Sequence, residues 1–135
     1  MSVLIETSAW IEYFRATGSS LDTTTTSIID TETRFHTCGP VRMEVCAGAR
    51  DDRSHATIES VLNRGEYTPI DQRHFDEASS IYRECRSNGI TVRSMVDCLI
   101  AAIAMDDDLE VLHGDRDFNA IASLFPLRIH PASID

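Results

Sequence analysis

The sequence predicts a three-layer α/β protein, in which a mostly parallel sheet of four to five strands is covered by helices on both faces. Short apolar runs alternate along the chain with longer segments of helical periodicity, and this alternation is typical of a parallel sheet. The first run, residues 3–5, is apolar at every position, which is the pattern of a strand buried on both faces. The 135 residues, 42% of them hydrophobic, are enough for one domain and too few for two.

The first half of the chain is predicted to form a strand, two helices, a strand and two further helices. The first strand runs directly into a helix that Thr7 or Ser8 can cap and that reaches Arg15. After a polar break, apolar residues at roughly helical spacing indicate the second helix. Proline at the first helical position starts the helix that follows the second strand. The expected ranges are residues 3–5, 7–15, 21–32, 34–38, 41–49 and 56–63.

The second half begins with a weak strand, in which Pro69 suits the edge of a sheet better than its centre. Asp71 can cap the long amphipathic helix that follows. Ser94 can cap a helix that is apolar on nearly every face and is therefore expected to be buried. A strand, a turn, a last helix and a last strand complete the chain. The expected ranges are residues 66–70, 72–87, 95–105, 110–113, 116–124 and 127–130.

The composition restricts the partners and the compartment. The net charge is −10, which excludes simple electrostatic adhesion to nucleic acid unless metal ions or local arginines overcome it. The longest apolar run, residues 98–105, is far shorter than a membrane span, and no basic leader precedes it, so we expect no membrane association. The cysteines form no C-x-x-C pair, which favours free thiols in a reducing cytoplasm. They are Cys38, Cys46, Cys85 and Cys98.

Five acidic residues share a placement at strand ends or helix starts. In a parallel sheet these places lie along one rim, so oxygen atoms that are far apart in the sequence can meet there. Carboxylate oxygens are the ligands that a hard divalent cation such as Mg²⁺ prefers. The five residues are Glu6, Glu44, Asp97, Asp115 and Asp117.

Each of these acids also has a structural interpretation. Ser94 and Asp97 resemble a capping box, and Asp115 and Asp117 suit a helix N-terminus through capping and the helix dipole. Glu44 could be a solvated helix residue. Asp97 is the exception, because an acid that leads into an apolar helix is partly buried and is costly unless it is bonded or paired with a metal. The pattern alone leaves both interpretations open.

Three segments resemble the signature blocks of PIN-domain ribonucleases, specifically the VapC toxins of VapBC toxin–antitoxin pairs. They are V-L-I-E-T-S-A-W-I-E-Y-F-R at residues 3–15, S-M-V-D-C-L-I-A-A-I-A at residues 94–104 and V-L-H-G-D-R-D-F-N-A-I-A at residues 111–122. The blocks come in the order of the family, and the resemblance spans essentially the whole chain. It implies a single PIN domain over residues 1–135, with a PIN-like three-layer sandwich.

The resemblance implies a Mg²⁺-dependent endoribonuclease toxin, with Mn²⁺ as a possible substitute, that cleaves tRNA or ribosomal RNA and leaves a 3′-hydroxyl and a 5′-phosphate. Position by position, Glu6, Glu44, Asp97 and Asp115 match the catalytic acidic quartet that holds the metal. Asp117 matches a frequent fifth metal ligand. Water activated by the metal would attack the phosphodiester in line.

Further residues are candidates for substrate contacts. By resemblance, Thr7 or Ser8 matches the small hydroxyl residue beside the first acid. Four arginines near the acids in sequence are candidates for phosphate contacts, although each could equally be a solvated surface residue. They are Arg15, Arg42, Arg93 and Arg116. The family also implies a cognate VapB-like antitoxin, whose tail supplies an arginine or lysine to the acidic pocket, and a homodimer formed through the early helices.

Glu6 departs from the family, which almost always has aspartate at this position. The extra methylene moves the carboxylate by about one bond length, and displacements of about 1 Å matter in catalysis. Glu6 is therefore a tolerated natural ligand, a weakened ligand or an introduced change, and the alternative function is a catalytically impaired PIN-type binding or regulatory module. His113 could be a ligand, but a structural role at the strand end is favoured. A phosphoryl-acceptor receiver domain would need a late lysine, and the chain contains none.

Overall fold

The computed structural model describes residues 2–134 and shows a five-stranded sheet in the order β3-β2-β1-β4-β5. Every pairing is parallel, and β1 lies at the centre, where Leu4 pairs with His36 on one side and with Val111 on the other. The predicted fold class is confirmed, as is the edge position of the third strand. The strands are β1 (Val3–Ile5), β2 (Phe35–Cys38), β3 (Glu66–Thr68), β4 (Glu110–Leu112) and β5 (Arg128–Ile129).

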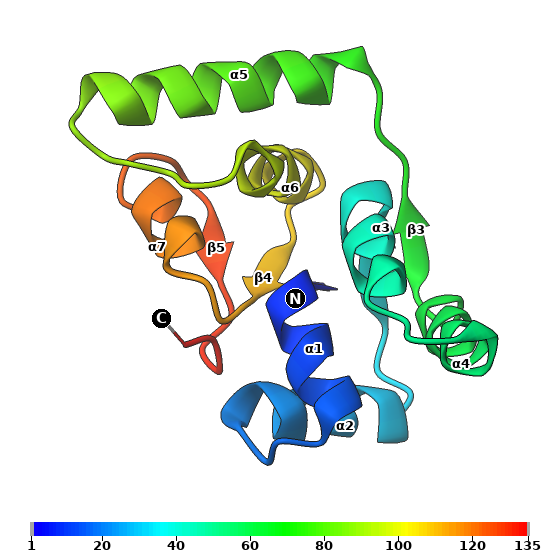
Figure 1. Cartoon of the computed structure of the whole chain (residues 1–135). Coiled ribbons are helices and arrows are strands. Elements are labelled where there is room, and N and C mark those ends of the chain that lie inside the picture. Colours follow the sequence, from blue (N-terminus) through cyan, green and yellow to red (C-terminus); the bar gives the residue numbers. More distant parts are fainter. Residues whose placement is uncertain (1, 135) are drawn as a thin grey trace.

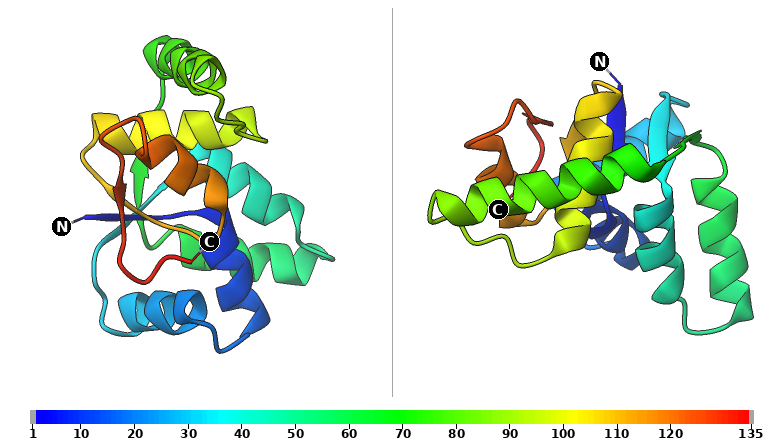
Figure 2. Two further views of the ribbon diagram at one scale, coloured as in Figure 1. Left: turned by 90° about the vertical axis from the view of Figure 1, so that its left-hand side faces the viewer. Right: turned by 90° about the horizontal axis from the view of Figure 1, so that it is seen from above.

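Helices cover both faces of this sheet (Figure 1). One face carries α6, with α5 stacked outside it, and α1 and α2 lie on the opposite side (Figure 2). As predicted, α6 is buried on nearly every face, because its apolar residues meet the sheet on one side and α5 on the other. The helices are α1 (Thr7–Arg15), α2 (Ser20–Asp30), α3 (Gly39–Ala47), α4 (Asp52–Leu62), α5 (Gln72–Ser87), α6 (Met95–Asp106) and α7 (Arg116–Ala122).

The helix caps differ in part from the prediction. Asp71 caps α5 as expected. The expectation that Thr7 or Ser8 caps α1 is wrong, because Glu6 is the N-cap and accepts a hydrogen bond from the backbone N–H of Ser8. Ser94 stands at the N-cap of α6, but its side chain makes no capping bond, so the suggested capping box with the acid at the third position does not form.

The helix α4 begins four residues earlier than expected. Asp51 and Ser54 form a reciprocal capping box, in which Asp51 Oδ1 accepts from the Ser54 N–H at 2.8 Å. Because this box satisfies free N–H groups of the first turn, residues 52–55, which lie outside the range expected for this helix, are also helical. None of the helices in residues 2–134 is both long and apolar enough to cross a membrane.

Candidate active site

Glu6 lies where the central strand ends. Its backbone N–H donates to the carbonyl of Leu112 at 3.1 Å, which continues the ladder between β1 and β4 by one residue. Its side chain is 3% exposed, and Oε1 accepts hydrogen bonds from both the N–H and the hydroxyl of Ser8. The Ser8 hydroxyl oxygen in turn accepts from the Gly114 N–H at 2.8 Å. Ser8 therefore joins the first acid to the loop that follows β4.

Burial raises the pKa of the Glu6 carboxyl from 4.5 to about 7. The two hydrogen bonds from Ser8 act in the opposite direction, and the charges of Glu44 and Asp115 raise the pKa further. Glu44 stands on α3, where its Oε1 accepts a hydrogen bond from the Thr7 hydroxyl at 2.7 Å. The two hydroxyl residues at the start of α1 thus each hold a different acid.

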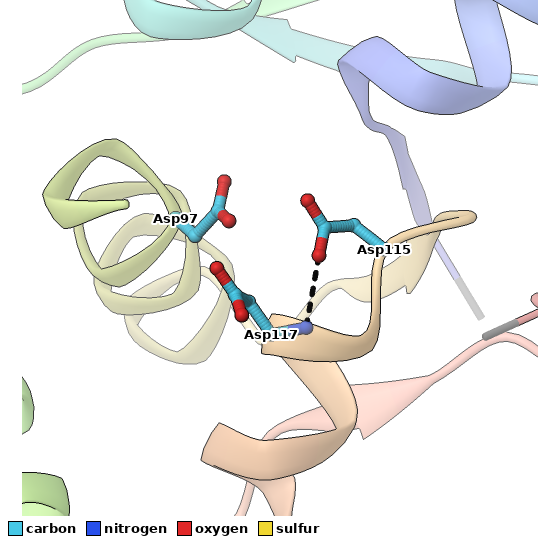
Figure 3. A group of neighbouring side chains, drawn as sticks. All are labelled: Asp97, Asp115 and Asp117. Atoms are coloured by element: carbon cyan, nitrogen blue, oxygen red, sulfur yellow. Dashed lines mark hydrogen bonds between the residues drawn. The ribbon is translucent and has the colours of Figure 1, made fainter. Parts of the chain in front are cut away.

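Asp97, Asp115 and Asp117 point toward one another from the starts of α6 and α7 (Figure 3). One carboxylate oxygen from each lies within 4.8 Å of the others. Asp115 is the N-cap of α7, and its Oδ1 accepts from the Asp117 N–H at 2.9 Å. Asp97 comes from the first turn of α6 and is 5% exposed. The structure therefore brings together three of the acids that the sequence placed at one rim.

The pKa of Asp97 is raised from 3.8 to about 8. Burial is the largest cause, followed by a hydrogen-bonding contact with Asp117 and by the charges of Asp115, Glu6 and Asp117. Because Glu6 interacts electrostatically with Glu44, Asp97 and Asp115, all five predicted acids belong to one electrostatic cluster at the carboxyl ends of β1 and β4.

The comparison with known proteins agrees with this arrangement. The family model of the PIN domain matches residues 3–124. The chain belongs to the PIN domain family. Its relatives within the family include Ribonuclease VapC11 of Mycobacterium tuberculosis (strain ATCC 25618 / H37Rv) and VapC ribonuclease Mb1587 of Mycobacterium bovis. Each is 42% identical over 128 residues, which cover 93% of this chain and 96% of the relative. The resemblance to VapC proteins predicted from the three sequence blocks is confirmed.

Solved structures of the same fold include toxin–antitoxin complexes. The VapBC2 structure from Rickettsia felis, bound to a promoter DNA fragment, has a TM-score of 0.75 at 13% identity and covers 96% of this PIN domain and 98% of that chain. The DNA-bound VapBC structure from Salmonella typhimurium has a TM-score of 0.75 at 19% identity, with 96% and 97% covered. VapC20 of Mycobacterium tuberculosis, described as a sarcin–ricin loop cleaving toxin, has a TM-score of 0.68 at 16% identity, with 91% and 95% covered.

The acidic cluster of this PIN domain fits a divalent cation. Asp97 Oδ2 is buried and has no hydrogen-bond partner within residues 2–134. A buried oxygen without a partner is costly, and a hard cation would satisfy it together with the neighbouring oxygens of Asp115 and Asp117. The donor set contains only carboxylate oxygens, as Mg²⁺ and Mn²⁺ prefer.

The four candidate arginines have different surroundings. Arg93 contacts the cluster, since its Nη2 donates to Asp115 Oδ1 at 3.2 Å and its Nε donates to Asp117 Oδ1 at 3.4 Å. Arg42 instead pairs with Glu59 at 3.1 Å and with Asn63. Arg15 and Arg116 are exposed, and neither guanidinium bonds to an acid among residues 2–134. Only Arg93 of the four therefore touches an acid of the cluster within these residues.

His113 is a fully buried residue that shapes the turn after β4. Its Nδ1 accepts from the Asp115 N–H at 3.0 Å, and its ring lies 5.0 Å from that of Phe118. This geometry agrees with the structural role favoured from the sequence. The link between Ser8 and Gly114 could not be predicted from the sequence, because it depends on the pairing of β1 with β4, which brings the start of α1 next to the loop after β4.

Proposed function

We propose that this PIN domain, residues 1–135, is a Mg²⁺-dependent endoribonuclease, the VapC toxin of a VapBC pair, with Mn²⁺ able to replace Mg²⁺. One observation carries the proposal: a partnerless buried oxygen of Asp97 faces a cluster of aspartates, in a chain 42% identical to a protein named as a VapC ribonuclease. The ribonuclease function is favoured over a non-catalytic PIN-type module, because Glu6 is held in the cluster rather than displaced from it.

The residues that would hold the cation are Glu6, Glu44, Asp97, Asp115 and Asp117. When bound, a divalent cation supplies positive charge that offsets the charge developing on the phosphate and lowers the pKa of the attacking water. The chain contributes the orientation of the acids. Ser8 holds Oε1 of Glu6 and Thr7 holds Oε1 of Glu44, so Oε2 is the oxygen of each carboxylate that these hydroxyls leave available to a cation.

The substrate is RNA, and we assign tRNA or ribosomal RNA as its class. A structural relative, VapC20, is described as a sarcin–ricin loop cleaving toxin, which supports a structured RNA. Arg93 is the strongest candidate for a phosphate contact, because its half-exposed side chain reaches from solvent to the acids. Arg15 and Arg116 are exposed and can serve the same purpose, whereas Arg42 would first have to leave Glu59.

The partners are a VapB-like antitoxin, which supplies an arginine or lysine to the acidic cluster, and a second copy of the chain. Structural relatives that are VapBC complexes support the antitoxin. The toxin acts in the cytoplasm, where its RNA substrates are found, without a membrane partner. Co-expression with the neighbouring small open reading frame should yield a complex, and light scattering of the purified toxin should give the mass of a dimer. A monomer that captures no partner would contradict both assignments.

The function is tested by cleavage of a total tRNA pool and of ribosomal RNA fragments with Mg²⁺, Mn²⁺ or EDTA. We expect cleavage with either metal and none with EDTA. Asp97→Ala should reduce cleavage by at least about 100-fold, since misplaced or missing catalytic ligands have effects of that size. Glu77→Gln, which removes an exposed acid on α5, is the matched control. Cleavage that survives EDTA or Asp97→Ala would overturn the proposal.

A further inference from the structure

A groove lies beside the acidic cluster, between α1, α3 and α4. Its volume is about 870 Å³, and Glu44 forms part of its wall. Because Glu44 is also bonded to Thr7 at the start of α1 and interacts with Glu6, the groove adjoins the acidic cluster. The side chains that carry the argument below are Ile11, Phe14, Arg15, Arg50, Arg53 and Ile58.

The groove is distinguished by arginines without partners. Six of the twelve arginines bond to a carboxylate or a carbonyl oxygen, as expected in a chain with 22 acids. These six are Arg34, Arg42, Arg64, Arg73, Arg93 and Arg128. In contrast, the guanidinium groups of Arg15, Arg50 and Arg53 make no hydrogen bond or ion pair within residues 2–134, and all three line the groove.

The local charge is opposite to that of the whole protein. Three arginines and two acids, Glu44 and Asp51, line the groove, which gives a formal charge of +1 (3 − 2) in a chain of −10. Asp51 Oδ1 caps α4 through the Ser54 N–H, and the Asp51 charge interacts with Arg50, but Asp51 forms no ion pair with a groove arginine within residues 2–134. Unpaired guanidinium groups are suited to phosphate oxygens, which they can bind in a fork geometry.

The wall of the groove is apolar between these charges. Ile11, which is 38% exposed, lies with Phe14 and Ile58 along it. Alternation of arginine with exposed apolar and aromatic surface is the chemistry that binds an unpaired nucleotide, since the phosphates meet cations and the base stacks on a side chain.

We infer that this groove binds the single-stranded RNA segment that flanks the scissile phosphate. Arg50 and Arg53 bind its phosphates, and the wall formed by Ile11 and Phe14 receives a base. The inference rests on the proposed ribonuclease function and adds the path of the substrate to it. It gives an acidic protein a local site for RNA, because three arginines without an ion pair within residues 2–134 line one groove that adjoins the site of cleavage.

The test compares two double variants of the full chain. Arg50→Gln/Arg53→Gln removes two groove arginines, and Arg83→Gln/Arg86→Gln is the matched control, because it removes two arginines of α5 that make no ion pair within residues 2–134. Binding of a 12-nucleotide single-stranded RNA is measured by fluorescence anisotropy at several salt concentrations, in an Asp97→Asn background that prevents turnover. The shift of the melting temperature with Mg²⁺, measured without RNA in the same double variants with Asp97 intact, reports whether the acidic cluster is preserved.

The groove variant should bind RNA about tenfold more weakly than the control, and the slope of log K against log salt should fall by about 1.4, or 0.7 for each lost phosphate contact. Arg50→Lys/Arg53→Lys keeps the charge and should restore most of the slope. In the background with Asp97 intact, KM for cleavage should rise more than kcat falls. The Mg²⁺ shift should match that of the control.

Equal RNA affinity and equal salt slope in the two double variants would overturn the inference. The same holds if RNA binding is unchanged while binding of the antitoxin weakens, because the groove would then be a protein-docking surface. If the lysine variant binds as poorly as the glutamine variant, charge is not the cause and the inference also fails. If the unaltered chain does not cleave RNA, the proposed function is refuted. The comparison of RNA binding by the two double variants would still decide the role of the groove.

Discussion

Replacing Asp97 with asparagine should stabilise the protein when no metal is present. The pKa of Asp97 is about 8 in the folded protein and 3.8 in the ordinary state of the group. Between these values the folded protein binds more protons than the unfolded chain does, so the free energy of unfolding falls as pH rises through this window. At pH 8 the Asp97 carboxyl is partly ionised, so the folded protein contains a buried charge that no hydrogen bond compensates within residues 2–134, and asparagine has nearly the same shape without that charge.

The size of the effect follows from the same pKa. Each unit of pKa elevation corresponds to about 1.4 kcal/mol, but neighbouring carboxyls share protons, so one substitution recovers only part of it, about 1–3 kcal/mol. An unfolding entropy of about 2.1 cal/mol/K per residue gives about 0.28 kcal/mol/K for this chain, so Tm should rise by about 4–11 °C at pH 8 in EDTA. Near pH 4 the gain should approach zero.

Mg²⁺ should cancel or reverse the difference in Tm between the two proteins. A cation that binds only the folded protein at 100 times its Kd adds about 2.7 kcal/mol, which is about 10 °C in Tm for a chain of this size. The unaltered chain should show this shift at pH 8 and a smaller one at pH 6, where protons compete for Glu6 and Asp97. Asp97→Asn should show little shift at either pH. Scanning calorimetry of both proteins, with Glu77→Gln as control, tests this prediction. The reasoning is refuted if Asp97→Asn has a lower Tm than the unaltered chain in EDTA and its Tm still rises with Mg²⁺.

Three further predictions concern the rim and the fold. Glu6→Gln should weaken Mg²⁺ binding about tenfold, as measured by calorimetry, and Glu6→Asp should weaken it less because the charge is kept. A Mg²⁺ affinity of Glu6→Gln equal to that of the unaltered chain would show that Glu6 is not a ligand. Arg93→Gln should tighten Mg²⁺ binding about threefold to tenfold, because a guanidinium next to two of the acids repels the cation, and Arg73→Gln on α5 should not. Gly65→Ala should cost about 1–3 kcal/mol in urea unfolding, because the new methyl group would overlap the ring of Phe35, and an unchanged midpoint would contradict this.

The strands and the buried helix could be predicted from the sequence because their signals are local. Burial of a strand is predicted by a continuous apolar run such as Val3–Ile5. Burial of a helix is predicted by apolar residues on nearly every face, as in Met95–Asp106. The helix caps were harder to predict, because serine and threonine are common N-caps. Only the structure shows that the Glu6 carboxylate accepts the hydrogen bond from the Ser8 N–H instead.

The positions of the acids could also be predicted from the sequence, whereas the groove could not. The acids could be placed at one rim because parallel strands all end on the same side, so topology alone brings Glu6 and Asp115 together. The groove depends on how α1, α3 and α4 pack, and no periodicity in the sequence sets Arg50 or Arg53 apart from the other arginines. What distinguishes them is that they line the groove and make no ion pair within residues 2–134, which only the structure shows.

The cluster and the groove carry charges of opposite sign, and this difference has a consequence for RNA binding. Five acids interact electrostatically at the carboxyl end of the sheet, and burial, together with their mutual repulsion, raises the pKa values of Glu6 and Asp97. Such a site repels RNA until a divalent cation is bound, because carboxylates and phosphate have the same sign. The groove arginines attract RNA whether or not the metal is present. RNA binding should therefore consist of a metal-independent part at the groove and a metal-dependent part at the cluster, and only the second part should disappear in EDTA.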